Sequence, residues 1–81
     1  MDEGAAADCS ACVVNHGEPP GQVILPAPRR ALVRADLYNG ETVILELDVI
    51  ALAAGYVCVR QDRPGRAPWL AWVPSDDATP L

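Results

Sequence analysis

Hydrophobic and polar residues alternate with a period of two through the middle of the chain. In Ala31–Tyr38 the odd-numbered positions are apolar, and charged residues stand between them. In Thr42–Leu52 the odd-numbered positions are again apolar, with Glu46 and Asp48 between them. This pattern is typical of β-strands with one buried and one wetted face. A helix would scatter Glu46 and Asp48 across its apolar stripe, so we predict two strands here.

Turn signals divide the rest of the chain into further short elements. Asn39-Gly40 separates the two alternating segments and is a strong hairpin signal, because both residues tolerate positive φ. Pro26 and Pro28 are expected to prevent regular pairing around them. The other predicted elements are strands over Gln22–Leu25, Tyr56–Gln61 and Trp69–Val73, a 3-10 turn capped by Ser75, and a returning strand over Ala78–Leu81. Four or five short strands in 81 residues predict a mainly β fold, a small antiparallel barrel around an aliphatic core.

The first twenty-one residues differ from the rest of the chain in composition, and we predict that they form a separate arm. They are acidic and rich in alanine, and they end in Pro19-Pro20-Gly21, which is a strong break. Asp2 could cap a short helix that runs through Ala5–Ala7 toward His16. A disordered arm is the alternative. We therefore divide the chain into an N-terminal arm, residues 1–21, and a β domain, residues 22–81.

The end of the chain resembles a known family of small domains. The sequence AWVPSDDATPL, residues 71–81, is similar to the end of SH3 and SH3-like domains. There a strand runs into a Pro-Ser 3-10 turn, and a last short strand closes the barrel. The order of the preceding strands extends the resemblance to Arg29–Leu81, with bacterial SH3-like or Tudor-like barrels as the nearest likeness. Val33 after Ala31-Leu32, and Asp77 after the turn, depart from the tyrosines of peptide-binding SH3 domains. The resemblance implies an SH3-like β-barrel that mediates protein contacts.

The motif Cys9-x-x-Cys12-x-x-x-His16 is the most specific signal for chemistry. On a helix these three side chains would share one face, and thiolate and imidazole are donors that zinc prefers. Cys58 is the candidate fourth ligand, although mid-strand it also suits a small buried apolar position. Unpaired thiols and a redox pair or disulfide are the alternatives. Because the three cysteines are odd in number, a disulfide framework is not expected.

The aromatic residues are the candidate partner-binding side chains. The chain has no phenylalanine, and its aromatic residues are Tyr38, Tyr56, Trp69 and Trp72. Gathered at one end of a barrel, they would bind a proline-rich peptide or a cation. They are also natural core material. Because Trp69 and Trp72 lie on opposite faces of a regular strand, we expect one in the core and Trp69 exposed.

The net charge of the chain and the composition of its first residues indicate which partners and which cellular compartment to expect. The formal net charge is −5, so phosphate backbones and anionic membranes repel the chain, and direct nucleic-acid binding is not expected. The start of the chain lacks the basic and apolar regions of a secretory signal, which favours a cytoplasmic location. Six arginines without a lysine are typical of a GC-rich genome, such as that of an actinobacterium or its phage.

The residues that could do chemistry do not form a recognisable catalytic set. His16 is the only histidine, and no phosphate-binding or dinucleotide fingerprint is present. We therefore predict a non-enzymatic interaction module, of an accessory or regulatory kind, that binds another protein. The sequence is also compatible with a homo-oligomer. One alternative is a small zinc protein that uses Cys9, Cys12, His16 and Cys58. The other is an acidic inhibitor whose Asp and Glu face engages a basic partner.

Overall fold

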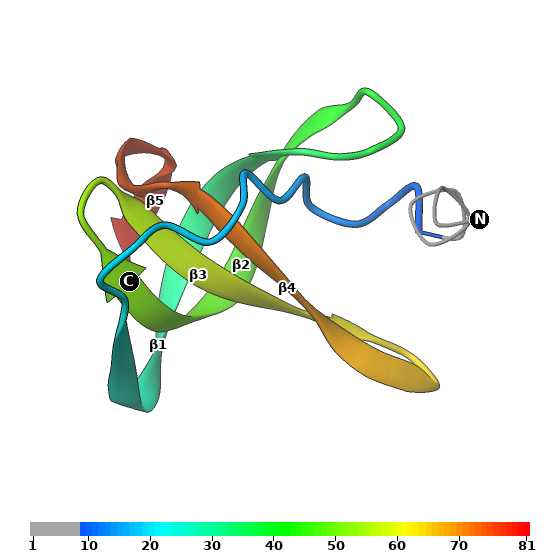
Figure 1. Cartoon of the computed structure of the whole chain (residues 1–81). Coiled ribbons are helices and arrows are strands. Elements are labelled where there is room, and N and C mark those ends of the chain that lie inside the picture. The colour runs from blue at the N-terminus through cyan, green and yellow to red at the C-terminus, as the bar shows by residue number, and fades with distance from the viewer. Residues whose placement is uncertain (1–8) are drawn as a thin grey trace.

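Five antiparallel strands form a single sheet in the computed structural model of the chain, which describes residues 9–81 (Figure 1). The strands are β1 (Val23–Asp36), β2 (Thr42–Ala53), β3 (Tyr56–Arg63), β4 (Arg66–Pro74) and β5 (Ala78–Pro80). A 3-10 turn, η1 (Ser75–Asp77), connects β4 to β5. The order across the sheet is β4-β3-β2-β1-β5. The predicted mainly β class is therefore confirmed, and Thr42–Leu52 lies in a strand.

The two-residue alternation separates core from solvent as predicted as far as Val49. It breaks at the register shift between Val49 and Ala51, and Ala51 packs in a separate cluster with Cys58 and Trp72. In β1 the buried side chains are Ala31, Val33 and Ala35, and the residues between them are exposed. The partner strand β2 buries Leu47 and Val49 against them, with Ala31 paired to Leu47. The main core also contains Val13, Leu37, Val57, Val59, Ala71 and Val73. This cluster is almost wholly aliphatic, which follows from a sequence without phenylalanine.

The first half of β1 interrupts the regular ladder. Ile24 pairs with Ala51, and the next pair along β1 is Arg29 with Val49. Residues 25–28, Leu-Pro-Ala-Pro, therefore bulge out opposite a single residue of β2. Proline has no N–H to donate to a ladder, so the prediction that Pro26 and Pro28 prevent regular pairing is confirmed. The strand nevertheless continues through the bulge as one element, where the sequence predicted a separate short strand.

The predicted Pro-Ser 3-10 turn is confirmed, but its predicted cap is wrong. Ser75 is the first residue of η1, Pro74 occupies the capping position, and no side chain caps the turn. The Ser75 N–H instead donates to the Gly55 carbonyl at 3.0 Å. This bond ties η1 to the turn between β2 and β3.

The expected N-terminal helix is absent from residues 9–22. Asp2 and Ala5–Ala7, where that helix would begin, lie outside the described residues. Cys9–Cys12 form a turn, and the chain then runs extended along the sheet, in front of β4 and β3 in Figure 1. Its main-chain groups bond to the sheet, which replaces the bonds that a helix would make within itself. Residues 9–16 are called the N-terminal strap below. Over residues 9–81, no helix is long and apolar enough to cross a membrane.

Candidate functional site

The N-terminal strap connects the edge strand β4 to the far end of β1. The Val14 N–H donates to the Asp36 carbonyl at 2.8 Å, and Val13 forms an antiparallel bridge with Leu37. On the other side, the His16 N–H donates to the Trp72 carbonyl at 2.9 Å. The Trp72 N–H donates in turn to Asn15 Oδ1 at 2.8 Å. The place where the strap lies is called the β1–β4 seam.

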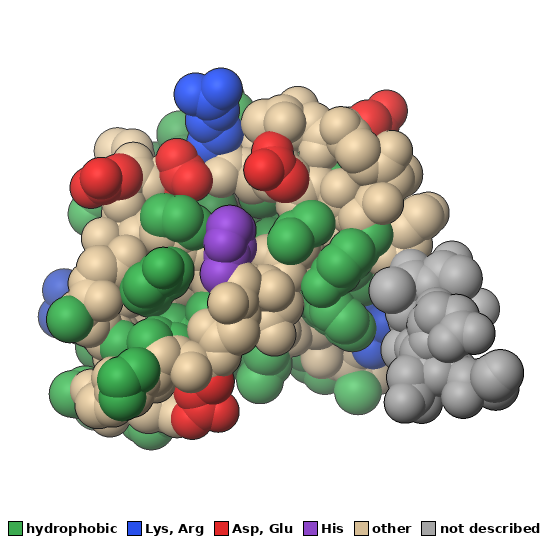
Figure 2. All heavy atoms as spheres, turned by 45° about the horizontal axis from the view of Figure 1, so that its top comes forward, with side chains coloured by type: hydrophobic (Ala, Val, Ile, Leu, Met, Phe, Trp, Pro, Cys, Tyr) green, Lys and Arg blue, Asp and Glu red, His purple; other side chains and the backbone are tan. Residues whose placement is uncertain are grey.

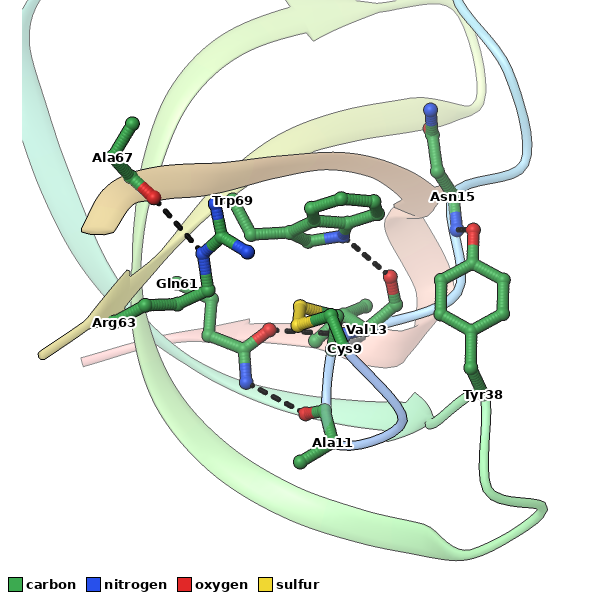
Figure 3. The surroundings of a disulfide bond; sticks show 10 residues. Cys9, Ala11, Val13, Asn15, Tyr38, Gln61, Arg63, Ala67 and Trp69 are labelled. Atoms are coloured by element: carbon green, nitrogen blue, oxygen red, sulfur yellow. Dashed lines mark hydrogen bonds between the residues drawn. A yellow bond between two sulfur atoms is a disulfide. The ribbon is translucent and has the colours of Figure 1, made fainter. Parts of the chain in front are cut away.

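Two side chains of the sheet hold the buried part of the strap. Gln61 Oε1 accepts the Val13 N–H, and Gln61 Nε2 donates to the Ala11 carbonyl, both at 2.9 Å (Figure 3). Trp69 Nε1 donates to the Val13 carbonyl at 2.8 Å. The Cys12 and Val13 side chains are fully buried. Because a buried main chain needs hydrogen-bond partners, Gln61 and Trp69 make it favourable for this segment to enter the core.

Tyr38 and Trp69 lie together at the strap. Their rings meet edge to face with centroids 6.0 Å apart, and the Arg63 guanidinium lies 5.6 Å from the Trp69 ring centroid. The Tyr38 hydroxyl accepts the Asn15 N–H at 3.2 Å. These two predicted partner-binding residues therefore contact a segment of their own chain.

Trp72 and Tyr56 lie in a second, smaller cluster. Trp72 is buried with Ala51 and Cys58, and Tyr56 packs partly buried against them. The four aromatic residues thus form two groups on different parts of the sheet. Trp72 is 6% exposed and Trp69 is the more exposed of the two tryptophans, but Trp69 is half-buried and packs against the main core, where the sequence predicted an exposed side chain.

The cysteines and the histidine occupy three different environments. Cys9 and Cys12 form a disulfide with their Cα atoms 5.2 Å apart, which is the disulfide alternative of the sequence analysis. Cys58 is a buried free thiol. Burial raises the pKa of Cys58, the backbone hydrogen bond to Ala71 opposes this rise, and the nearby Glu18 carboxylate adds to it. His16 is exposed at the end of the strap.

The structure does not bring the four predicted zinc ligands together. Within residues 9–81, no group of three or more His, Cys, Asp or Glu side chains is close enough to hold a metal ion. The disulfide uses the two thiols of the motif, and Cys58 belongs to the separate cluster around Trp72. Zinc binding stays a prediction from the sequence.

An apolar groove that the sequence analysis missed lies between β1, β2 and β5. It has a volume of about 440 Å³, and Arg29, Arg30 and Ser75 contribute the polar part of its lining. Its apolar lining residues are Leu25, Ala31, Val49, Leu52, Val57, Ala78 and Pro80. Val23 and Ile24, in the β1 segment that leads to Leu25, are 61% and 67% exposed. The break Leu25-Pro26-Ala27-Pro28 before two arginines is the sequence signal for this groove, but only the fold brings Val49 and Pro80 beside Leu25.

Acidic and basic side chains form a ladder across the outer face of β1, β2 and β3. Arg30 contacts Glu46 at 3.2 Å and Asp48 at 3.3 Å. Arg60 contacts Asp48 at 2.6 Å and Asp62 at 3.7 Å. The carboxylates predicted to form an acidic face are therefore paired with arginines of the same sheet. Exposed pairs of this kind contribute little stability, about 0–1 kcal/mol each.

A smaller, polar hollow lies beside the strap. It has a volume of about 230 Å³ and is lined by His16, Arg34, Asp36 and Asp77, together with Val14, Ala35, Val73 and Pro74. Figure 2 shows His16 at the centre of this face, with hydrophobic and acidic side chains around it. The lining residues carry charges of both signs but no hydroxyl or thiol, so His16 has no nucleophile to activate in this hollow.

Comparison of the chain with protein-family models, curated proteins and solved structures finds no match.

Proposed function

We propose that this protein is a non-enzymatic docking module of SH3-like architecture, and that it binds an extended apolar segment of another protein in the β1–β5 groove. The observation that carries the proposal is the groove itself. It is an open apolar hollow, bordered by further exposed apolar residues, in a domain too small to leave such surface uncovered without cost.

Several features support the SH3-like part of the proposal. The strand order places β5 beside β1, and η1 leads directly into β5. The turn η1 and the strand β5 belong to residues 71–81, which carry the resemblance in the sequence. The strap bonds to both β1 and β4 and so supplies the contact that would close the sheet into a barrel.

The bulge in β1 determines how an occupant would be held. β5 pairs only with Ala31–Val33, so the earlier part of β1 has no strand beside it on that edge. Pro26 and Pro28 cannot donate hydrogen bonds there, so an added strand would not form a continuous ladder. The occupant must therefore be recognised by its apolar side chains, each of which gains about 1.5–3 kcal/mol on full burial.

The rim of the groove favours an acidic residue in the occupant. Arg29 and Arg30 both line it, and Arg30 already pairs with Glu46 and Asp48. Arg29 pairs with no carboxylate of residues 9–81. An Asp or Glu beside the apolar side chains would meet Arg29 and fix the direction of the segment.

Selection from a library of displayed random peptides tests the proposal on the full chain. We expect enrichment of peptides with apolar residues next to Asp or Glu. Leu52→Asp should weaken their binding by about tenfold or more, because it places a charge in the apolar groove. Arg29→Glu should shift the preference to peptides with Lys or Arg. The matched control is Ile44→Asp, at a β2 residue that is 69% exposed and not part of the groove, which should leave binding unchanged.

Two results would overturn the proposal. One is a set of selected peptides whose binding is insensitive to Leu52→Asp. The other is a concentration-dependent dimer, detected by analytical ultracentrifugation, that Leu52→Asp dissociates. That dimer would assign the groove to a second copy of the chain.

The contacts support zinc binding and inhibition of a basic partner less well than they support a docking module. Zinc would compete with the Cys9–Cys12 disulfide for two of its predicted ligands. An acidic inhibitor would need Glu46 and Asp48 to leave their arginine partners before they met a basic protein.

A further inference from the structure

The disulfide stands at the beginning of the strap, where its two cysteine residues differ in exposure. Cys9 is partly exposed, and Cys12 is fully buried. The Cys12 N–H donates to the Cys9 carbonyl at 3.0 Å, so the disulfide closes a single tight turn (Figure 3). A thiol in solution therefore reaches Cys9 more readily than the buried Cys12.

The turn closed by the disulfide is attached to the loop between β1 and β2. The Tyr38 N–H donates to the Cys12 carbonyl at 3.2 Å, and the Asn39 N–H donates to the Ser10 carbonyl at 2.9 Å. The strap then continues directly into the β1–β4 seam through Val13 and Val14. The bonds that tie the turn to this loop are followed at once along the chain by the bonds of Val13 to Gln61 on β3 and of Val14 to Asp36 on β1.

We propose that the Cys9–Cys12 disulfide is a site of thiol–disulfide exchange, and that its reduction by a dithiol releases the strap from the β1–β4 seam. In the first step a reductant thiolate attacks Cys9 Sγ, the bond between the two protein sulfurs breaks, and Cys12 leaves as a thiolate that takes up a proton. The second thiol of the reductant then attacks the mixed disulfide and releases Cys9, which is protonated in turn. The protein gains two electrons and two protons, and the dithiol becomes a disulfide.

Release of the strap would expose main-chain groups that the folded seam now satisfies. These are the carbonyls of Asp36 and Trp72 and the Trp72 N–H, which lie on two different strands. An unpaired strand edge readily accepts a new strand, so the reduced seam would be open to an extended segment of another chain. The seam and the apolar groove use different residues, so the two proposals stand or fall separately.

Cys58 provides an internal reference for distinguishing release from unfolding. The Cys58 residue is 5% exposed and packs with Ala51 and Trp72 in a cluster that does not include Cys12. Burial also raises its pKa, which keeps the reactive thiolate scarce near neutral pH. Local opening of the strap would expose Cys9 and Cys12 to an alkylating reagent, whereas global unfolding would expose all three cysteines together.

The test treats the full chain with dithiothreitol under native conditions and then applies iodoacetamide and hydrogen exchange, both read by mass spectrometry. We expect Cys9 and Cys12 to be alkylated about tenfold or more faster than Cys58. Amide exchange at Val14, His16 and Trp72 should rise by about tenfold or more, while exchange at Val33 and Val59 stays unchanged. Equal alkylation rates for the three cysteines, or unchanged exchange at the strap, would overturn the proposal.

Two variants complete the experiment. Cys9→Ser with Cys12→Ser should show fast strap exchange without reductant and no response to it. Cys58→Ala, the control, should keep the full response to dithiothreitol. A double serine variant whose strap amides stay protected would contradict the proposal, as would a wild-type chain purified without reductant that carries three free thiols.

Discussion

Gln61 shows how a single polar side chain allows an apolar strap to be buried. It lies half-buried on β3, and its amide group bonds at both ends to the strap, accepting from Val13 and donating to Ala11. The side chain matches the donor and acceptor of an extended main chain, much as a neighbouring strand would. In the sequence it is only the last residue of a predicted strand, because its partners lie 48 and 50 positions away.

Replacing Gln61 by Met should lower the free energy of unfolding by about 1–3 kcal/mol, because the buried Val13 N–H would lose its acceptor. The measurement is chemical denaturation followed by tryptophan fluorescence. Gln22→Met is the matched control, since Gln22 is exposed and bonds only to Glu18 at the surface. It should change stability by less than about 0.5 kcal/mol. Equal effects of the two substitutions would show that Gln61 does not hold the strap.

The hairpin of β1 and β2 is the element whose geometry follows most directly from local sequence. Gly40 has φ +91°, and its N–H donates to the Leu37 carbonyl at 2.9 Å. Asn39 Oδ1 accepts the Glu41 N–H at 2.9 Å, which closes the turn from its other side. A Cβ at position 40 would meet no atom within 4 Å, so the demand for glycine there is conformational and not steric crowding.

Gly40→Ala should therefore lower the free energy of unfolding by about 1 kcal/mol through backbone strain alone. Gly40→Asn should cost clearly less, because asparagine adopts positive φ more readily than alanine. Thermal unfolding of the two variants beside the wild type measures the difference. If the alanine variant were as stable as the asparagine variant, backbone strain at positive φ would not be the cause of the lost stability.

At the scale of the whole molecule, the balance of charge restricts the classes of partner. The chain carries eleven acidic residues against six arginines, and two of those arginines already pair with carboxylates in the ladder across β1, β2 and β3. The remaining basic groups are too few to neutralise a phosphate backbone. Long-range repulsion therefore acts on any polyanion that approaches.

The protein should accordingly bind a short DNA duplex with a Kd weaker than about 10⁻⁴ M at physiological salt. Fluorescence anisotropy of a labelled duplex, titrated with the full chain at low and physiological salt, measures this affinity. Tighter binding that weakens steeply as salt increases would show that the arginines form a basic surface after all.

The alternation of residues, the Asn39-Gly40 turn and the Pro-Ser turn could be recognised without coordinates. Each expresses a preference within a few residues: side chains of a strand alternate between faces, and particular turns need particular φ angles. That is why the strands, the hairpin and η1 follow from the sequence by itself, together with the aliphatic core. The predicted cap on η1 is wrong because Ser75 is the first residue of the turn and Pro74 stands at the capping position. The Ser75 N–H bonds to Gly55, twenty positions away, which no local pattern reveals.

Only the tertiary structure decided what the N-terminal segment and the aromatic residues do. Cys9 and Cys12 suit one face of a helix as well as a tight turn, and the choice rests on bonds to β1, β3 and β4 that no local pattern reveals. Tyr38 and Trp69 likewise hydrogen-bond to the strap, and the apolar groove is lined by residues of β1, β2, β3 and β5 that are distant in the sequence. Local preferences determine elements, whereas a seam or a groove arises where residues distant in the chain meet and must satisfy one another's hydrogen bonds and apolar surface.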